Sequence, residues 1–463
     1  MRSAALAVVA LGGGGLMLAA APKPAVAPRP NVILISIDTL RADRLGAYGH
    51  PRPTSPAIDA LARESILFER AYSQSPKTAS SHMSVFTSLY PSGHGVVNWE
   101  ENGFRLSPQI PTLPGILNRA GYRTAANTAG GNVAAELGFD EGFDAYSSQG
   151  ARGQSLAVAP FVLTDLARSS RSAGKPFFLF LHNYDVHDPY IPAPVFAKLF
   201  VDPAYRGDMI GDPDAVRESA SGDGWEVLHA KYWANFNRKS PADRKYVSDL
   251  YDGGIREMDT ALAPFFERFR ELGLEANTVL VLISDHGEEF LEHGGINHNS
   301  VYQEVMHVPL ILRLPGASFG GTRVSARVRL IDVMPTLLAL AGLPSPPHAQ
   351  GESLIPLYAG PGPKRDRFVF SEWPLAGQRA LQSEAWKFVQ RPGHDEFYDL
   401  ATDPGEQKDL AATQGPLVYQ AATRSDRLQS LSRELLASFD RGAKPQLDDA
   451  TRHQLQALGY LGP

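Results

Sequence analysis

The sequence predicts an α/β fold, with a large, mostly parallel sheet flanked by helices and a small C-terminal α+β subdomain. Short apolar runs rich in β-branched residues recur along the chain, as expected for strands buried on both faces of a parallel sheet. Helical patterns separate these runs, and such alternation is typical of parallel α/β folds. After residue 343 the pattern changes to shorter strand candidates and one amphipathic helix.

The first strand is predicted at residues 31–37, where NVILISI is apolar except for Asn31 and Ser36. Ser55 and Pro56 then resemble an N-cap followed by a first-turn proline, and they predict a helix over 56–65. The remaining elements of the large sheet are three strand candidates and one long helix. The strands are predicted at 177–181, 279–283 and 308–312, and the helix at 255–272.

The C-terminal part begins after a proline-rich connection over residues 344–363. Short strands are predicted at 368–372, 386–390 and 396–398, and apolar residues at helical spacing predict a helix near 428–439. We therefore expect three parts. These are a signal peptide with its linker at 1–30, a catalytic domain at 31–343, and the C-terminal α+β subdomain at 366–463.

Composition excludes several classes of function. The net charge is −6, and the sequence contains no stripe of basic residues. A nucleic-acid partner is therefore not expected. The chain has no cysteine, which excludes disulfides, thiolate metal sites and a cysteine nucleophile.

The N-terminus predicts export. A basic start, an apolar run over residues 4–21 and nearby small residues are typical of a cleaved secretory signal. The expected location is periplasmic or extracellular, without a stable membrane span after cleavage. An uncleaved N-terminal anchor is the alternative, because the run approaches the minimum length for a bilayer span.

Polar residues follow three of the predicted strands. Asp38 follows the first, His182 and His187 follow the second, and Asp285 with His286 follows the third. In open α/β sheets, ligands bind beyond the carboxyl ends of the strands. Carboxylates with imidazole suit a divalent cation, so Ca²⁺, Mg²⁺, Mn²⁺ or Zn²⁺ is expected. Such an ion polarises an oxyacid ester.

Thr78 is the candidate nucleophile. It lies in SPKTASSH, and the segment after it can continue as a helix. A hydroxyl at a helix N-terminus faces free backbone N–H groups and the positive end of the helix dipole, where an anionic ester binds favourably. The alternative interpretation is an ordinary threonine at a helix start.

These segments together resemble the sulfatase family of the alkaline phosphatase superfamily. The resemblance spans nearly everything after residue 30. Its motifs are NVILISIDTLRAD from Asn31, SPKTASSH from Ser75, LYPSGHG from Leu89, HNYDVHDPY from His182, SDHGEEF from Ser284, YDL with DPGE from Tyr398, and the tail segment 458–461.

The resemblance implies an alkaline phosphatase-like fold and roles for particular residues. Asp38, Asp285 and His286 are then metal ligands, with Thr39 and Thr78 as further ligand candidates, and Thr78 is the nucleophile. His187 and His298 match positions that contact the substrate anion or protonate the leaving group. His82 and His182 are candidate substrate-binding residues. The expected partner is a small anionic ester, or a sulfated or phosphorylated glycan or lipid.

The sequence departs from the usual sulfatase pattern at two of these positions. Typical sulfatases carry Cys or Ser where Thr78 stands and convert it to formylglycine within C/S-x-P-x-R, whereas threonine cannot be converted. His82 replaces the arginine of that motif. The resemblance therefore favours a phosphoester, phosphodiester or phosphonate ester over a sulfate ester. The alternatives are a phosphoglycerol or phosphoethanolamine transferase, or a non-catalytic metal-binding homologue.

Overall fold

The fold was described from a computed structural model of the chain. It describes residues 29–97, 105–148, 154–207, 225–360 and 366–440, with isolated positions beyond them, and the side chains of 225–228 are excepted. Residues 1–28 of the predicted signal peptide and linker (1–30) and the tail segment 458–461 lie outside the described residues. Among the described residues, none of the helices combines the length and the apolar character that a bilayer span requires.

A large sheet forms the centre of the molecule, in the strand order β11-β2-β10-β6-β1-β5-β3-β4, with β9 paired to β2. Its strands are β1 (Asn31–Ile37), β2 (Ile66–Tyr72), β3 (Arg123–Thr128), β4 (Ala145–Ser148), β5 (Phe177–Asn183), β6 (Thr278–Ile283), β9 (His307–Val308), β10 (Leu310–Arg313) and β11 (Arg323–Arg329). The central strands β6, β1 and β5 run parallel. The strand predicted at 308–312 is split at Pro309 into β9 and β10, and both are antiparallel to their neighbours.

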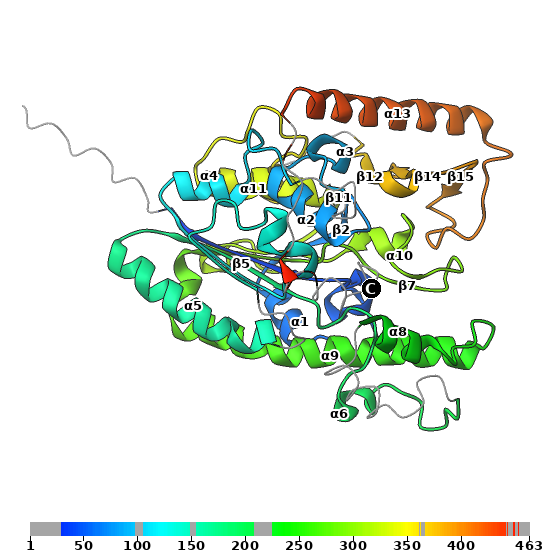
Figure 1. Cartoon of the computed structure of the whole chain (residues 1–463), viewed down its shortest axis with the longest axis horizontal. Helices are drawn as coiled ribbons and strands as arrows, with labels where there is room; N and C mark the ends of the chain where they lie inside the picture. Colours follow the sequence, from blue (N-terminus) through cyan, green and yellow to red (C-terminus); the bar gives the residue numbers. More distant parts are fainter. Residues whose placement is uncertain are drawn as a thin grey trace, which may run out of the picture.

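Helices cover both faces of this sheet, as Figure 1 shows. On one face lie α2 (Thr78–Thr87), α4 (Leu113–Arg119) and α11 (Val333–Leu340), and on the other lie α1 (Pro56–Arg63), α5 (Gln154–Ala173) and α9 (Pro241–Glu271). The side chains of β1 alternate between the two layers: Val32 and Leu34 pack on the first, whereas Ile33 and Ile35 pack on the second. A strand between two helical layers must be apolar on both sides, which explains the continuous run NVILISI.

Several shorter helices and turns complete the large unit. The α-helical ones are α3 (Pro91–His94), α6 (Pro194–Ala197), α8 (Trp225–Trp233), α10 (Gln303–Met306) and α12 (Ile355–Ala359). The 3₁₀ turns are η1 (Ala42–Arg44), η2 (Gly46–Tyr48), η3 (Gly131–Val133), η4 (Ala135–Leu137), η5 (Leu274–Asn277), η6 (Pro315–Ala317), η7 (Leu330–Asp332) and η8 (Pro374–Ala376), the last of them in the C-terminal part. The hairpin of β7 (Glu289–Phe290) and β8 (Ile296–Asn297) follows β6 at the end of the sheet that carries the predicted site.

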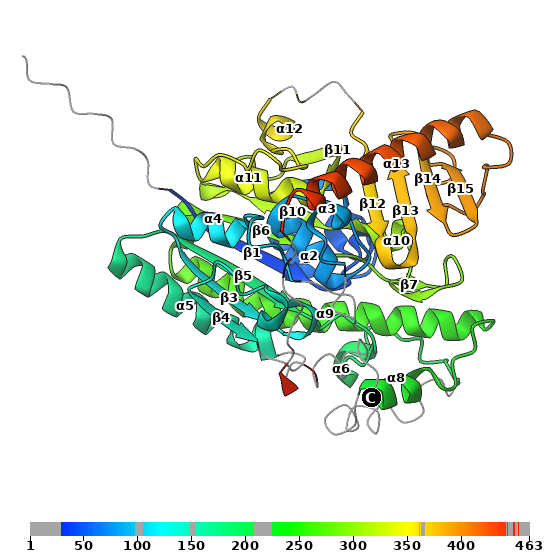
Figure 2. The same ribbon diagram turned by 45° about the horizontal axis from the view of Figure 1, so that its top comes forward.

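The C-terminal part is a four-stranded antiparallel sheet covered by one helix. Its strands are β12 (Val369–Trp373), β13 (Gln378–Gln382), β14 (Trp386–Arg391) and β15 (His394–Asp399). Figure 2 shows α13 (Gly415–Ala437) crossing this sheet. The helix is longer than the predicted 428–439, and β13 adds a strand that the sequence did not predict. The predicted domain boundaries themselves stay a prediction.

Candidate active site

Three neighbouring strands bring the predicted residues to one edge of the sheet. Asp38 directly follows β1, His182 is the next-to-last residue of β5, and Asp285 lies two residues after β6. The backbone N–H of Asp38 donates to the carbonyl of Asn183 at 3.0 Å, which continues the β1–β5 pairing up to the acid. Thr78 begins α2 above this edge. The topology thus brings together residues from distant segments that the sequence predicted to form one site.

Asp38, Asp285 and His286 are suited to holding a metal ion. One ligand atom of each lies within 4.8 Å of those of the other two. Burial raises the pKa of Asp38 to about 8. Burial, and then the charge of Asp38, raise the pKa of Asp285 well above its usual range. Two buried carboxylates this close are unfavourable as anions, and a divalent cation between them would offset both effects.

Several buried oxygen atoms at this end of the sheet have no hydrogen-bond partner among the described residues. Asp38 Oδ1, Thr39 Oγ1 and Asp285 Oδ2 are buried, and none has a hydrogen-bond partner among the described residues. Buried polar atoms are almost always satisfied, so the two unpaired carboxylate oxygens of Asp38 and Asp285 fit a hard divalent cation. The role of Thr39 as a ligand stays a prediction.

Hydrogen bonding sets the tautomer of His286. Its Nδ1 lies 3.1 Å from the carbonyl of Gly287, so Nδ1 donates and the lone pair of Nε2 faces the site. Ser284 Oγ donates to the carbonyl of His286 at 2.6 Å and accepts from the N–H of Leu40 at 2.9 Å. This serine ties the loop after β6 to the loop after β1, and so fixes the distance between Asp38 and Asp285.

Thr78 lies within hydrogen-bond distance of the cluster. Its hydroxyl donates to Asp38 Oδ2 at 3.2 Å, and Oγ1 is 3.3 Å from His286 Nε2. The side chain is buried at the first residue of α2, beside the free N–H groups of the helix. The interpretation as an ordinary helix start leaves these two contacts unexplained. The Thr78 hydroxyl thus lies within hydrogen-bond distance of two of the three clustered residues.

His82 is fully buried and contacts the backbone of Thr78. Its Nδ1 donates to the carbonyl of Thr78 at 2.8 Å, and its Nε2 accepts from Ser36 Oγ at 2.8 Å. Burial, followed by the charge of His182, lowers the pKa of His82 well below its usual range. The side chain is therefore neutral with both ring nitrogens engaged. Its predicted contact with substrate stays a prediction, and the geometry favours support of the start of α2 instead.

His182 has a different environment. Its Nε2 is 3.5 Å from Asp38 Oδ2, and neither ring nitrogen has a hydrogen-bond partner in the described part of the chain. Burial, and then the charge of His187, lower the pKa of His182 to about 3. A neutral, buried ring with unsatisfied nitrogens beside the metal cluster is consistent with the predicted role in binding substrate.

His298 lies beside both His286 and His187. The ring centroid of His298 is 4.4 Å from that of His286 and 5.2 Å from that of His187. The Nδ1 of His298 is 3.0 Å from Glu288 Oε1. Burial lowers the pKa of His298 and raises that of Glu288, so burial favours the uncharged form of each group.

Two functional candidates had no assigned role in the sequence analysis. Glu288 lies in the motif SDHGEEF, and Lys77 precedes the proposed nucleophile. Glu288 pairs with His298, and Lys77 lies over the ring of Trp373. Both contacts depend on the fold, so neither has a local sequence signature.

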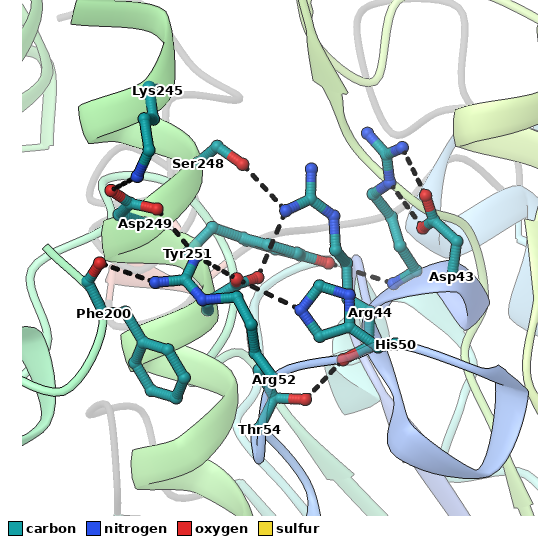
Figure 3. A network of polar contacts seen from close by, with 12 residues as sticks. Asp43, Arg44, His50, Arg52, Thr54, Phe200, Lys245, Ser248, Asp249 and Tyr251 are labelled. Atoms are coloured by element: carbon teal, nitrogen blue, oxygen red, sulfur yellow. Dashed lines mark hydrogen bonds and ion pairs between the residues drawn. The ribbon is translucent and has the colours of Figure 1, made fainter. Parts of the chain in front are cut away.

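Residues after β1 are held in place by α9. The carbonyl of Thr39 accepts from the hydroxyl of Tyr251 at 2.6 Å, and that hydroxyl accepts from the N–H of Arg41 at 3.0 Å. Figure 3 shows Arg44, His50 and Arg52 converging on α9 beside Tyr251. They meet the fully buried Asp252 at 3.2, 3.2 and 2.8 Å respectively. The metal-binding loop therefore rests on a helix with fixed charge pairing.

Comparison with known proteins agrees with this geometry. A family model described as Sulfatase matches residues 30–343, and one described as N-sulphoglucosamine sulphohydrolase, C-terminal matches residues 291–433. The N-acetylglucosamine-6-O-sulfatase of Bacteroides thetaiotaomicron is 23% identical, over 84% of this chain and 84% of its own. Arylsulfatase K of Bos taurus is 25% identical, over 83% of this chain and 78% of its own.

A solved structure has the same fold. The phosphonate monoester hydrolase of Agrobacterium radiobacter superposes with a TM-score of 0.69, at 21% identity, over 87% of this chain and 96% of its own. The alkaline phosphatase-like architecture predicted from the sequence is thereby confirmed.

Proposed function

Because the chain belongs to the sulfatase family of ester hydrolases, whose members use a divalent metal ion, we propose that Thr78 is its nucleophile and that phosphate or phosphonate esters are its substrates. The observation that carries the proposal is the hydroxyl of Thr78, 3.2 Å from Asp38 Oδ2 and 3.3 Å from His286 Nε2 at the start of α2. A threonine alkoxide can attack phosphorus directly and needs no conversion to an aldehyde.

The metal ion would be held by Asp38, Asp285 and His286, with Thr39 and Thr78 as additional oxygen donors. When bound, a divalent cation supplies Lewis-acid polarisation of the ester and lowers the pKa of a nearby hydroxyl. Its identity is proposed as Ca²⁺, Mg²⁺, Mn²⁺ or Zn²⁺, since the donor set mixes carboxylate oxygen with imidazole nitrogen.

In the proposed reaction, Thr78 Oγ1 forms a bond to phosphorus and the bond to the leaving oxygen breaks. The threonine proton passes to Asp38 Oδ2. His298 Nε2 gives its proton to the leaving oxygen while its Nδ1 takes the proton of Glu288. Water then cleaves the phosphothreonine, its proton restores the His298–Glu288 pair, and Asp38 returns a proton to Thr78.

His187 is the second candidate for the leaving-group proton. Its ring lies 5.2 Å from that of His298, so either histidine can face the leaving group. We favour His298 because its Nδ1 lies 3.0 Å from Glu288 Oε1, and this carboxyl group can supply a proton. The natural substrate is proposed to be a small anionic ester or a phosphorylated glycan or lipid. Export remains a prediction from the N-terminal sequence.

Sulfate esters are the second candidate substrate, because the relatives by sequence include named sulfatases. The test is a panel of aryl phosphate, phosphodiester, phosphonate and sulfate compounds, each measured with several divalent cations. Turnover of phosphorus esters above sulfate esters is expected, and a preference for sulfate would overturn the ranking.

Replacing the nucleophile gives the second test of this function. Thr78→Ala is expected to lower kcat by about 10³-fold or more, because the covalent route is lost. Binding of the metal should persist through Asp38, Asp285 and His286, which calorimetric titration with Mn²⁺ can measure. Thr78→Ser is the matched control and should retain turnover. A Thr78→Ala enzyme that works at the wild-type rate would remove this residue from the reaction.

A further inference from the structure

A second group of potential metal ligands lies between the β7–β8 hairpin and α10. It consists of Glu289, His293 and Glu304, and one ligand atom of each lies within 4.8 Å of those of the other two. Glu289 begins β7, His293 lies in the turn between β7 and β8, and Glu304 lies in α10. The group shares no residue with the proposed catalytic metal cluster.

The backbone brings the two glutamates of this group together. The N–H of Glu288 donates to the carbonyl of Glu304 at 3.2 Å, and the N–H of Leu291 donates to the carbonyl of Gly295 at 2.8 Å across the hairpin turn. A Cβ on Gly295 would lie 2.7 Å from Oε2 of Glu289, so the glycine leaves room for this carboxylate. Both glutamate side chains are thereby held in the interior, with Glu289 2% exposed and Glu304 6% exposed.

Hydrogen bonding orients the ring of His293. Its Nε2 lies 2.9 Å from the carbonyl of Glu406, so Nε2 donates and Nδ1 faces Oε1 of Glu304 at 2.6 Å. A lone pair on Nδ1 and a carboxylate oxygen repel each other at this distance, so a positive charge must lie at Nδ1. A proton or a metal ion can supply it. A backbone carbonyl that accepts from the far ring nitrogen is the usual support of a histidine metal ligand.

The charges of the group favour a divalent cation over a proton. A proton on His293 offsets the charge of only one glutamate. Among the described residues, Glu289 has no ion pair with lysine or arginine, and its carboxyl group has the hydroxyl of Ser300 as a hydrogen-bond partner. Without a metal ion, Glu289 must take up a proton itself or remain an unpaired buried charge, which is unfavourable. A divalent cation offsets both carboxylates and accepts the lone pair of a neutral His293.

We propose that Glu289, His293 and Glu304 bind one Zn²⁺ ion, which fastens the β7–β8 hairpin to α10. One imidazole with carboxylates is a donor set that suits Zn²⁺, whereas Ca²⁺ and Mg²⁺ prefer oxygen ligands alone. In the zinc-free protein a proton occupies the position at Nδ1. Glu288 precedes β7 and His298 follows β8, so the ion fixes the loop that carries both residues. Its role is structural and does not depend on which ester the enzyme cleaves.

The test measures zinc binding by the full-length chain after the catalytic cluster has been disabled. In the Asp38→Asn/Asp285→Asn protein, calorimetric titration with ZnCl₂ near neutral pH should show one Zn²⁺ per chain. Adding His293→Gln or Glu304→Gln should weaken this binding by more than about 100-fold, because loss of a direct ligand costs more than loss of its supporting partner. X-ray absorption at the zinc edge should show one imidazole, with nitrogen and oxygen ligands at about 2.0–2.2 Å.

Two further variants make the result specific to this group. Gly295→Ala retains all three ligands but displaces the carboxylate of Glu289, so it should also weaken zinc binding, by about 10-fold. It keeps the test decisive if a ligand variant fails to fold. The matched control is His394→Gln, since the His394 side chain is 57% exposed and lies outside the group, and it should bind Zn²⁺ as tightly as its parent.

Thermal unfolding gives a second measurement. Zn²⁺ should raise the Tm of the Asp38→Asn/Asp285→Asn protein and leave that of its His293→Gln derivative unchanged, because only a folded site binds the ion. The inference is overturned if the parent binds no Zn²⁺, or if His293→Gln, Glu304→Gln and Gly295→Ala all bind it as tightly as the parent does. Neither measurement involves turnover, so failure of this inference and failure of the proposed function are observed separately.

Discussion

Burial of Glu288 determines which ring nitrogen of His298 carries the proton. The carboxyl group is completely buried, burial raises its pKa, and it lies 3.0 Å from Nδ1 of the histidine. A protonated carboxyl donates to Nδ1, which leaves the ring proton on Nε2. In the proposed reaction, the pair would therefore present a proton to the leaving group while its net charge stays zero.

The Glu288→Gln variant should show whether Glu288 only positions the ring of His298 or also supplies a proton to it. Glutamine can still donate a hydrogen bond to Nδ1 of His298, but it has no proton to give up. We expect kcat to fall by about 10²- to 10⁴-fold for alkyl esters, which need an acid, and to change little for p-nitrophenyl esters. The measurement is the dependence of kcat on the pKa of the leaving group.

His298→Gln and the double variant control that experiment. If the two residues act as one acid, the double variant should be no slower than the slower single variant. Additive losses, or an equal loss with p-nitrophenyl esters, would contradict a shared proton and indicate a structural role.

The segment from Thr39 to Arg52 is the element on which the metal site rests. Thr39 has φ of 57°, a left-handed conformation that is unfavourable for a β-branched residue. Its carbonyl is held by Tyr251, and its N–H donates to Asp285 Oδ1 at 3.3 Å. The strained backbone is thus stabilised from α9 and from the loop after β6.

Tyr251→Phe tests this support. The variant leaves the carbonyl of Thr39 and the N–H of Arg41 buried without their partner, which should lower the free energy of unfolding by about 1–3 kcal/mol. The metal concentration required for half-maximal activity should rise, because the loop that carries Asp38 is less well held. Urea unfolding and a metal titration measure the two effects.

Tyr246→Phe is the control for that variant, since Tyr246 lies on the same helix but stacks on Tyr205 at 4.0 Å between ring centroids. It should not alter the metal dependence. A Tyr251→Phe enzyme with normal metal dependence would show that the loop holds its shape without α9.

At the scale of the whole molecule, the C-terminal part is joined to the large sheet through a buried polar junction. His293 Nδ1 lies 2.6 Å from Glu304 Oε1, and its Nε2 lies 2.9 Å from the carbonyl of Glu406. Glu406 also pairs with the buried Lys387 at 2.7 Å and accepts from the N–H of Gln303 at 2.9 Å. The hairpin after the metal ligands is therefore connected to the sheet that carries Trp373.

This junction should make stability depend on pH. Burial alone would lower the pKa of His293, but the hydrogen bond to Glu304 and its charge outweigh burial and raise it. For a histidine with a raised pKa, the stabilisation is fully present below the unfolded value of 6.5 and is lost as pH rises through the folded value. The urea midpoint of the wild type should therefore fall relative to His293→Gln as pH increases above 6.5.

The exposed His394 serves as the control for that measurement, since its side chain is 57% exposed and its replacement by Gln should not change the pH dependence. A wild type and a His293→Gln variant that remain separated by the same amount at every pH would contradict a protonated His293 at the junction.

Much of the large sheet could be predicted because its central strands are buried on both faces. The runs at 31–37, 177–181 and 279–283 are apolar for that reason, and each corresponds to an observed strand. β2 and β11 were not predicted, because ILFERAY and RVSARVR mix charged and apolar residues as strands nearer the sheet edge do. The direction of β10 was also beyond prediction, since antiparallel pairing depends on its neighbours and not on its composition.

The metal cluster was predictable from strand ends, whereas its supporting contacts were not. Asp38, Asp285 and His286 each follow a recognisable strand, so the topology of an α/β fold brings them together. The hydrogen bonds of His82, Glu288 and Tyr251 join residues between four and 212 positions apart in the chain. Such pairings have no local sequence signature, because they depend on how the elements pack.

The most direct test of the central claim is a crystal structure of the protein loaded with Mn²⁺, with an anomalous difference map. We expect a peak at about 2.0–2.3 Å from carboxylate oxygens of Asp38 and Asp285 and from His286 Nε2, with Thr78 Oγ1 in the same coordination sphere. A peak elsewhere, or a Thr78 hydroxyl turned away from the ion, would contradict the proposed chemistry.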